Sequence, residues 1–159
     1  MDTQLRIVAL SDREIQITRG FNAPRKLVFD AYTKPELVRQ WLFGPPGWTF
    51  KVCEIDLRVG GKYRYVWSGP EGEMGMGGVY RDIKPPERIV STEKFDQAWY
   101  PGEAVGTVVM TETSGKTLVT TTVRYESKDA RDAVMKSPME HGLRAGFDRL
   151  AELVETSLS

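Results

Sequence analysis

The sequence predicts an α+β domain, in which a curved antiparallel sheet of about six to seven strands wraps around a long C-terminal helix. Three features predict it: a strand-like segment followed by two short helical ones, a central series of alternating segments separated by turn residues, and a last segment with helical periodicity. A terminal helix of this kind must bury its apolar stripe on one face of the sheet. If the sheet curves around that helix, an internal cavity opens between them.

The first strand and the two short helices are predicted from the start of the chain. Residues 13–21 alternate, with Ile15 and Ile17 facing one way and polar side chains the other, as in a half-buried strand. Pro24 stands where a proline opens a helix, and apolar residues at helical spacing follow it. A second short helix is expected to begin at Pro35.

A series of strand-like segments fills the middle of the chain. They are expected at residues 48–57, 62–68, 74–83, 88–95, 106–112 and 117–125. Ser114 and Gly115 predict the turn of a hairpin between the last two segments. Gly75, Gly77 and Gly78 predict a bulge or a close approach of backbone in the third.

The C-terminal segment changes period. From about residue 129 to residue 158, apolar side chains recur every three to four positions, which predicts one amphipathic helix, the longest element of the fold. Pro138 lies inside this segment and either kinks the helix or marks its true first turn.

Composition excludes several classes of protein. The 159 residues suit one domain, with a core over residues 13–156, and the apolar and charged fractions of 40% and 28% are those of an ordinary globular protein. Lys+Arg and Asp+Glu are both 22, so neither a nucleic-acid nor a membrane partner is expected. Cys53 is the single cysteine, and no apolar segment has the length of a signal peptide or a membrane span. We expect a cytoplasmic protein.

Three aromatic residues in one segment point to a candidate site. Tyr63, Tyr65 and Trp67 recur at every second position, so their rings stand on the same face of a strand. Lys62 and Arg64 face the other way. A sheet face this aromatic is either part of the core or the wall of a pocket for an apolar ligand. The sequence leaves both interpretations open.

Several segments carry a resemblance to a known superfamily. They are residues 24–37 (PRKLVFDAYTKPEL) with Trp41 after them, residues 54–63 (EIDLRVGGKY) and residues 78–89 (GVYRDIKPPERI). With these residues the chain resembles the START-like superfamily, also called SRPBCC, helix-grip or Bet v-like. Within it, the chain most resembles the AHSA-type family, named after activators of the heat-shock protein 90 ATPase. Residues 142–150 fit the closing helix of that family, although Leu143 stands where a tryptophan is common.

The resemblance implies a curved sheet that grips the long helix and leaves a pocket between them. Some relatives bind lipids, hormones or polyketides there, a minority catalyse reactions, and members share no fixed catalytic set. The eukaryotic chaperone activators carry an additional N-terminal domain. This chain has no room for it, so a chaperone partner is not expected.

We therefore expect a binding protein for a small hydrophobic or amphipathic molecule that is lipid-like, aromatic or polyketide-like, with no cofactor and no metal. The ligand would enter past the two short helices and the loop of residues 97–104. A homodimer is allowed by the sequence. The expected ligand-binding residues are aromatic, methionine and leucine side chains: Trp41, Trp48, Tyr63, Tyr65, Trp67, Met76, Phe95, Met110, Met139, Leu143 and Phe147.

The alternatives are a cyclase- or hydrolase-type enzyme that uses the same cavity, and an interaction protein similar to the chaperone activators. An enzyme would need two titratable groups that converge in the cavity, and His141 with Tyr65 or Glu54 with Asp56 are the pairs to consider. The simpler interpretation places His141 at the edge of the helix stripe and the two carboxylates on a solvated strand face. Catalytic residues are therefore not assigned.

Overall fold

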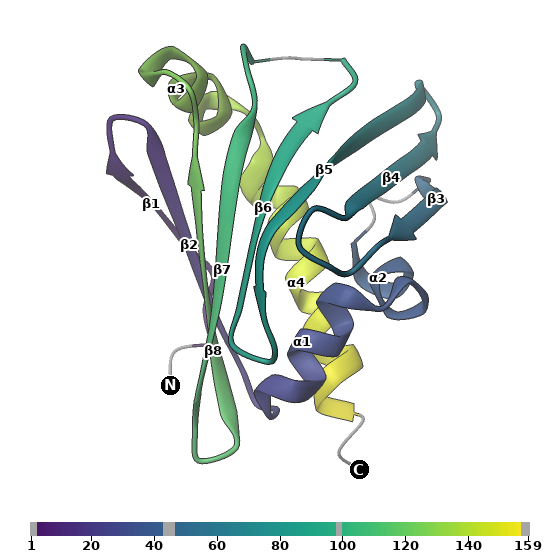
Figure 1. The fold of residues 1–159 in the computed structure, drawn as a ribbon, viewed down its shortest axis with the longest axis vertical. Coiled ribbons are helices and arrows are strands. Elements are labelled where there is room, and N and C mark those ends of the chain that lie inside the picture. Colours follow the sequence, from purple (N-terminus) through teal and green to yellow (C-terminus); the bar gives the residue numbers. More distant parts are fainter. Residues whose placement is uncertain (1–2, 43–46, 98–99, 157–159) are drawn as a thin grey trace.

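The computed structural model describes residues 3–42, 47–97 and 100–156 (Figure 1). Within them, an eight-stranded sheet has the order β1-β2-β8-β7-β6-β5-β4-β3, and each pair of neighbours is antiparallel. The strands are β1 (Arg6–Ser11), β2 (Glu14–Phe21), β3 (Thr49–Ile55), β4 (Lys62–Gly69), β5 (Gly72–Lys84), β6 (Arg88–Phe95), β7 (Ala104–Thr113) and β8 (Lys116–Arg124).

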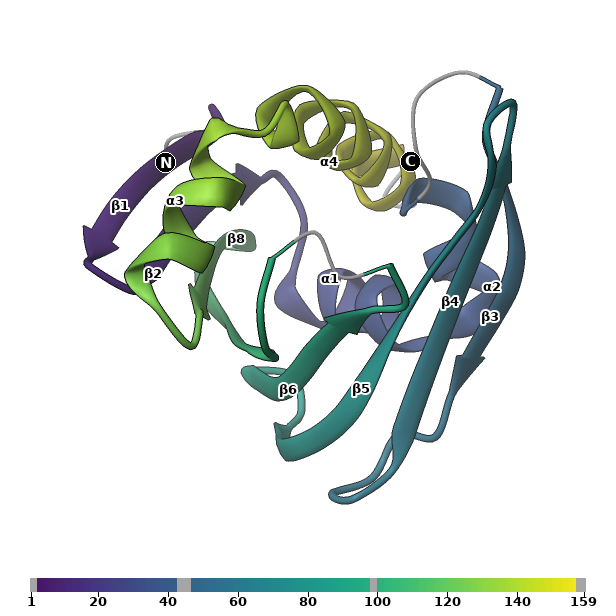
Figure 2. The same cartoon turned by 90° about the horizontal axis from the view of Figure 1, so that it is seen from above.

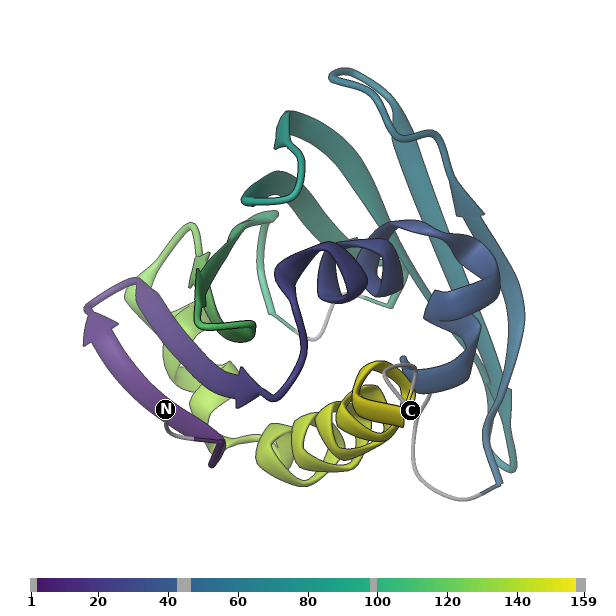
Figure 3. The same ribbon diagram turned by 90° about the horizontal axis from the view of Figure 1, so that it is seen from below.

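The helices lie on the concave side of this sheet. They are α1 (Arg25–Thr33), α2 (Pro35–Trp41), α3 (Lys128–Lys136) and α4 (Met139–Thr156). Figures 2 and 3 show the sheet as a curved wall, with α4 across its open side and α1 and α2 beside α4. The helices α1 and α2 both contact α4. The predicted class, a curved antiparallel sheet around a C-terminal helix, is confirmed.

The strand count is higher than the sequence predicted because β1 was not recognised. Val8 and Leu10 are each 49% exposed, so this strand has no buried face to mark it in the sequence. It is held at the edge of the sheet by pairing with β2, in a register that sets Ile7 opposite Ile17. Backbone pairing with the next strand along the chain, and not side-chain alternation, defines β1.

The C-terminal segment predicted as one helix from residue 129 is two helices, and the long one begins directly after Pro138, which is the alternative in which this proline marks its first turn. Helix α3 ends at Lys136, and Ser137 then adopts an extended conformation, with φ −78° and ψ 163°. A proline ring clashes with the helical conformation of the residue before it, so Pro138 excludes Ser137 from a helix. Helix α4 begins at Met139, directly after the proline. The predicted end at residue 158 lies outside the described residues.

The glycines of β5 allow another strand to approach closely, as the sequence predicted. A Cβ atom on Gly78 would lie 1.9 Å from the carbonyl oxygen of Thr92 on β6. A bulge shifts the register of the same two strands further along, between Tyr80 and Asp82. Bulges of this kind bend a strand and increase its twist, which favours a curved sheet.

The core lies between the concave face of the sheet and the helices. Its largest fully buried side chains include Ile15 and Phe21 from β2, Met110 from β7 and Leu150 from α4. Within the part of the chain that the structure describes, no helix combines the length and the hydropathy that crossing a membrane requires.

Candidate functional site

A cavity of about 240 Å³ lies between the concave face of the sheet and helices α1, α2 and α4. Most of the residues that the sequence predicted for ligand binding line it: Trp41, Tyr63, Tyr65, Trp67, Met76, Leu143 and Phe147. Sequence reasoning missed the other lining residues: Ile17, Tyr32, Val38, Leu42, Tyr80, Ile89, Ser91, Glu93, Val108 and Thr121.

The wall on the sheet side is an aromatic row on β4. Tyr63, Tyr65 and Trp67 are each less than one-tenth exposed, and their neighbouring ring centroids are 5.0 Å and 5.9 Å apart. Strand alternation turns Arg64 to the opposite face, where its guanidinium donates to Asp96 across a distance of 2.7 Å. The rings are therefore core residues and cavity wall at once, so the two interpretations left open by the sequence coincide.

The polar atoms of two of these rings, Tyr63 and Trp67, form hydrogen bonds with backbone. The Tyr63 hydroxyl donates to the carbonyl oxygen of Thr92 at 2.6 Å, and the indole nitrogen of Trp67 donates to that of Leu42 at 2.7 Å. Such bonds fix the orientation of each ring and leave its apolar body to face the cavity. The row is therefore a rigid surface for contact with an apolar group.

The helix side of the cavity is aromatic as well. Trp41 of α2 stacks on Phe147 of α4, with ring centroids 6.1 Å apart and an interplanar angle of 18°. Tyr32 of α1 also contacts Trp41, at 4.9 Å between ring centroids. The indole nitrogen of Trp41 donates to the carbonyl oxygen of Ala31 at 2.8 Å, which ties α2 to α1. Both walls are therefore aromatic.

Glu93 of β6 is the acidic residue of the cavity. Its Oε1 accepts a hydrogen bond from the Tyr100 hydroxyl at 3.3 Å. Burial raises the pKa of the Glu93 carboxyl, while the bond from Tyr100 opposes that rise. The sequence held a signal for this residue, since Ile89, Ser91 and Glu93 alternate on one strand face. Because Glu93 shares the strand face of the buried residue Ile89, the alternation predicts an inward-facing carboxyl.

Four of the predicted ligand-binding residues lie outside the cavity, and each has another packing role. Met110 is 1% exposed within the core, and the Phe95 ring meets Tyr100 edge-on at 6.2 Å. The Trp48 ring packs over Gly69, where a Cβ atom would lie 2.3 Å from the indole. Met139 is partly buried at the first residue of α4. The type of a residue, aromatic or methionine, is therefore not enough to assign it to the core or to the cavity wall.

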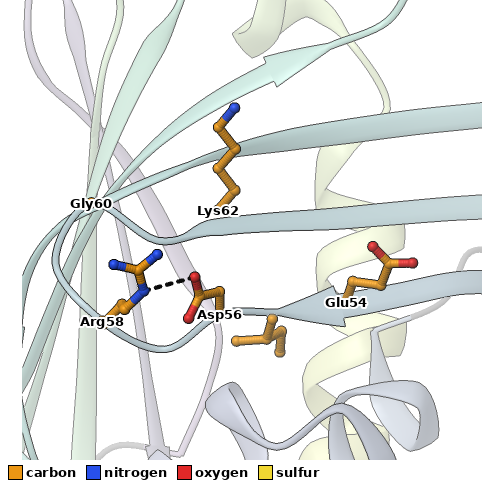
Figure 4. Close-up of a pocket in the computed structure, with 6 residues that line it drawn as sticks. Glu54, Asp56, Arg58, Gly60 and Lys62 are labelled. Atoms are coloured by element: carbon orange, nitrogen blue, oxygen red, sulfur yellow. Dashed lines mark hydrogen bonds and ion pairs between the residues drawn. The ribbon is translucent and has the colours of Figure 1, made fainter.

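Neither proposed catalytic pair converges in the cavity, which Tyr65 alone of the four residues lines. His141 is exposed on α4, whereas Tyr65 is buried. Glu54 and Asp56 border a hollow on the outer side of the sheet, where Figure 4 shows Arg58 turned to Asp56, with 2.9 Å between Nε and Oδ2. Among the described residues, no group of three or more histidine, cysteine or acidic side chains could hold a metal ion.

That outer hollow has a volume of about 400 Å³, which is larger than the cavity. Its wall, however, consists mostly of exposed charged side chains, two of which, Asp56 and Arg58, form an ion pair. An apolar ligand would gain little by replacing water there, because the hydrophobic effect acts on apolar surface. The internal cavity is the better candidate site.

Cys53 lies beside α2, and the loop expected at the entrance is described in part. Burial raises the pKa of the Cys53 thiol, which lies 3.8 Å from the carbonyl oxygen of Pro35, so the thiol stays protonated at neutral pH. The loop of residues 97–104 was expected to border the route into the cavity. Residues 98 and 99 of that loop lie outside the described part of the chain.

The chain is similar to one family of known proteins and to several solved structures. The family model described as Activator of Hsp90 ATPase homolog 1-like protein matches residues 22–155. A crystal structure of a protein from Rhodobacter sphaeroides is 30% identical, with a TM-score of 0.89, over 96% of this chain and 99% of that one. Protein CV1439 from Chromobacterium violaceum is 28% identical, with a TM-score of 0.77, over 91% and 99%.

A solution structure of an AHSA1-like protein from Aeromonas hydrophila has a TM-score of 0.66 over 89% of this chain and 93% of that one. At 18% identity, it shares the fold alone. No curated protein matches the sequence.

Proposed function

This chain belongs to the family of proteins like activator of Hsp90 ATPase homolog 1, with a START-like fold, and from that premise we propose that it binds a small aromatic molecule inside its cavity. One observation carries the proposal: a cavity of about 240 Å³ is aromatic on both its sheet side and its helix side. Ligand pockets are concave and mostly apolar, with a few polar groups that orient the ligand. Glu93, Ser91 and Thr121 are such groups here.

The volume narrows the ligand class. An apolar cavity of about 150 Å³ holds one benzene molecule. A cavity of about 240 Å³ therefore suits one substituted ring or two fused rings. A long acyl chain does not fit without rearrangement, so we favour the aromatic alternative over the lipid-like and polyketide-like ones.

Isothermal titration calorimetry tests the proposal. The probes are indole and 2-naphthol as one- and two-ring ligands, and decanoate as a chain-like comparison. We expect saturable binding of at least one ring compound and none of decanoate. A complete lack of saturable binding by both ring compounds would contradict the proposal.

A variant that fills the cavity supplies the matched control. Leu143 lines the cavity from α4, and Leu143→Trp would place an indole in the space that the ligand needs. Met135→Trp adds the same ring on α3, at a position that is 39% exposed. We expect Leu143→Trp to abolish binding and Met135→Trp to retain it. Equal affinity in both variants would locate the ligand elsewhere.

The other expectations from the sequence lend no support to this proposal. A cyclase- or hydrolase-type enzyme needs converging titratable groups, and His141 does not face the cavity. A chaperone-activating role rests on the name of the family alone. A homodimer and a cytoplasmic location stay predictions from the sequence, and size-exclusion chromatography checks the first of them.

A further inference from the structure

Among the described residues that line the cavity, one carries a negative charge and none carries a positive charge. Glu93 contributes a carboxyl group, and no described residue that lines the cavity is a lysine, arginine or histidine. The hydrogen bond from Tyr100, at 3.3 Å, is longer than a strong charge-assisted bond. An ionised carboxylate that is withdrawn from water is unfavourable unless a positive charge or several donors accompany it.

Among the described residues, the titratable groups that interact electrostatically with Glu93 do not supply that charge. They are the phenols of Tyr63, Tyr100 and Tyr125, and burial raises the pKa of each of them, with the charge of Glu93 as a further cause. All three are therefore neutral near pH 7. The Tyr63 hydroxyl already donates to the carbonyl oxygen of Thr92. A carboxylate accepts about four hydrogen bonds, so Glu93 keeps acceptor capacity for a ligand.

The rings beside Glu93 also favour a cation. Tyr63, Tyr65 and Tyr80 line the same cavity, and the ring of Tyr63 lies 5.0 Å from that of Tyr65 and 5.5 Å from that of Tyr80. The face of an aromatic ring is negative and attracts ammonium groups. A carboxylate beside several aromatic rings is an environment that suits an organic ammonium ion.

Building on the proposed function, we propose that the cavity binds a small aromatic amine in its protonated form. The ammonium group pairs with the carboxylate of Glu93, and the ring packs against the row of Tyr63, Tyr65 and Trp67. The ligand thus brings the positive charge that the cavity wall lacks, while its ring fills the apolar part of the space.

Three probes of nearly equal size test the inference by calorimetry at pH 7: phenethylamine, which is cationic, 2-phenylethanol, which is neutral, and phenylacetate, which is anionic. We expect phenethylamine to bind at least about tenfold more tightly than 2-phenylethanol, as hydrogen bonds to charged groups imply, and phenylacetate not to bind. This comparison uses the unmodified protein and needs no variant.

Glu93→Gln then removes the charge at almost constant volume. We expect it to weaken phenethylamine binding by about tenfold or more and to weaken 2-phenylethanol binding much less, since a neutral hydroxyl has no charge to pair with the carboxylate. Glu71→Gln removes a charge from an exposed turn and should change neither affinity. This control separates the cavity carboxylate from the net charge of the protein.

Equal or tighter binding of 2-phenylethanol by the unmodified protein would overturn the inference, as would unchanged phenethylamine binding by Glu93→Gln. Both results leave the proposed function intact, because in each case a ring compound would still bind. If indole or 2-naphthol binds while phenethylamine does not, the inference alone fails. If no ring compound of either panel binds, the proposed function fails with it.

Discussion

Gly61 has no space for a side chain, and this constraint helps to orient the aromatic row. A Cβ atom on Gly61 would lie 2.1 Å from the carbonyl oxygen of Asp56. The same turn is tied to β5, since the amide of Tyr80 donates to the carbonyl oxygen of Gly61 at 2.9 Å. A slip of one residue in β4 would turn Tyr63 and the rest of the row outward.

We therefore expect Gly61→Ala to lower the free energy of unfolding by about 1–3 kcal/mol, because the backbone of the turn must move. Gly142→Ala is the control. Its added methyl group meets open space on α4, so its stability should be unchanged or higher by up to about 1 kcal/mol. Urea unfolding measures both variants. Equal stability of the two would show that the turn is not constrained.

Glu93 is expected to make stability depend on pH. Burial raises the pKa of this carboxyl in the folded state above its ordinary value of 4.5, so the folded protein binds the proton more tightly than the unfolded chain does. The free energy of unfolding therefore falls as pH rises from 4.5 through the raised pKa.

Glu93→Gln lacks this titration and should melt a few degrees higher than the unmodified protein at pH 7, with the difference shrinking toward acidic pH. Thermal melts across the acidic and neutral range check this. A variant that melts lower at pH 7 would show that the folded protein stabilises the charged carboxylate. Glu71→Gln, at its exposed turn, should follow the unmodified protein.

At the scale of elements, α3 begins at a defined cap. The Ser127 hydroxyl oxygen accepts a hydrogen bond from the amide of Ala130 at 3.0 Å, and Lys128 pairs with Asp132 one turn later at 3.0 Å. Arg131 of the same helix donates to the carbonyl oxygen of Ser11 at 2.6 Å, which attaches α3 to the turn between β1 and β2. The cap therefore supports a contact between distant segments.

Ser127→Ala removes the side chain that satisfies this amide, and we expect it to lower the free energy of unfolding by about 0.5–2 kcal/mol. Ser127→Asp keeps an acceptor at the cap and should retain most of the stability. Thermal melts of both variants measure the difference. If aspartate is as destabilising as alanine, the hydroxyl has another role.

For the whole molecule, the cavity exists only when the sheet and the helices are assembled. Its walls come from β2, from β4 to β8 and from the helices, so the unfolded chain has no binding site. A ligand that binds only the folded protein must then raise its stability.

At a concentration of 100 times its dissociation constant, such a ligand adds about 2.7 kcal/mol, which corresponds to a rise in melting temperature of roughly 5–10 °C for a chain of this length. Differential scanning calorimetry with the tightest ring compound checks this, and Leu143→Trp should show no shift. A shift retained in that variant would place the bound molecule outside the cavity.

Local pattern was sufficient for much of the fold. Prolines at positions 24 and 35 predicted the starts of α1 and α2, and alternation predicted β6 over residues 88–95, as the structure has it. These signals depend on a few neighbouring residues. Strand β1 could not be predicted in this way. It pairs with β2 directly after a short turn, but Val8 and Leu10 are exposed, so no alternation of buried and exposed side chains marks it.

The candidate site was predictable in part. Strand alternation placed Tyr63, Tyr65 and Trp67 on one face, and that face is buried. It could not separate Met110, which packs in the core, from Met76, which lines the cavity, since both are apolar and inward-facing.

The sequence by itself determined the order of the elements from β2 to β8, the inward face of β4 and the proline after which the long C-terminal helix begins. Only the tertiary structure decided where space remains between the walls, and that Glu93 meets this space. The reason is physical: the alternation of side chains along a strand shows on which side of the strand a residue lies. The curvature of the sheet and the position of α4 decide whether that residue meets another side chain or a cavity.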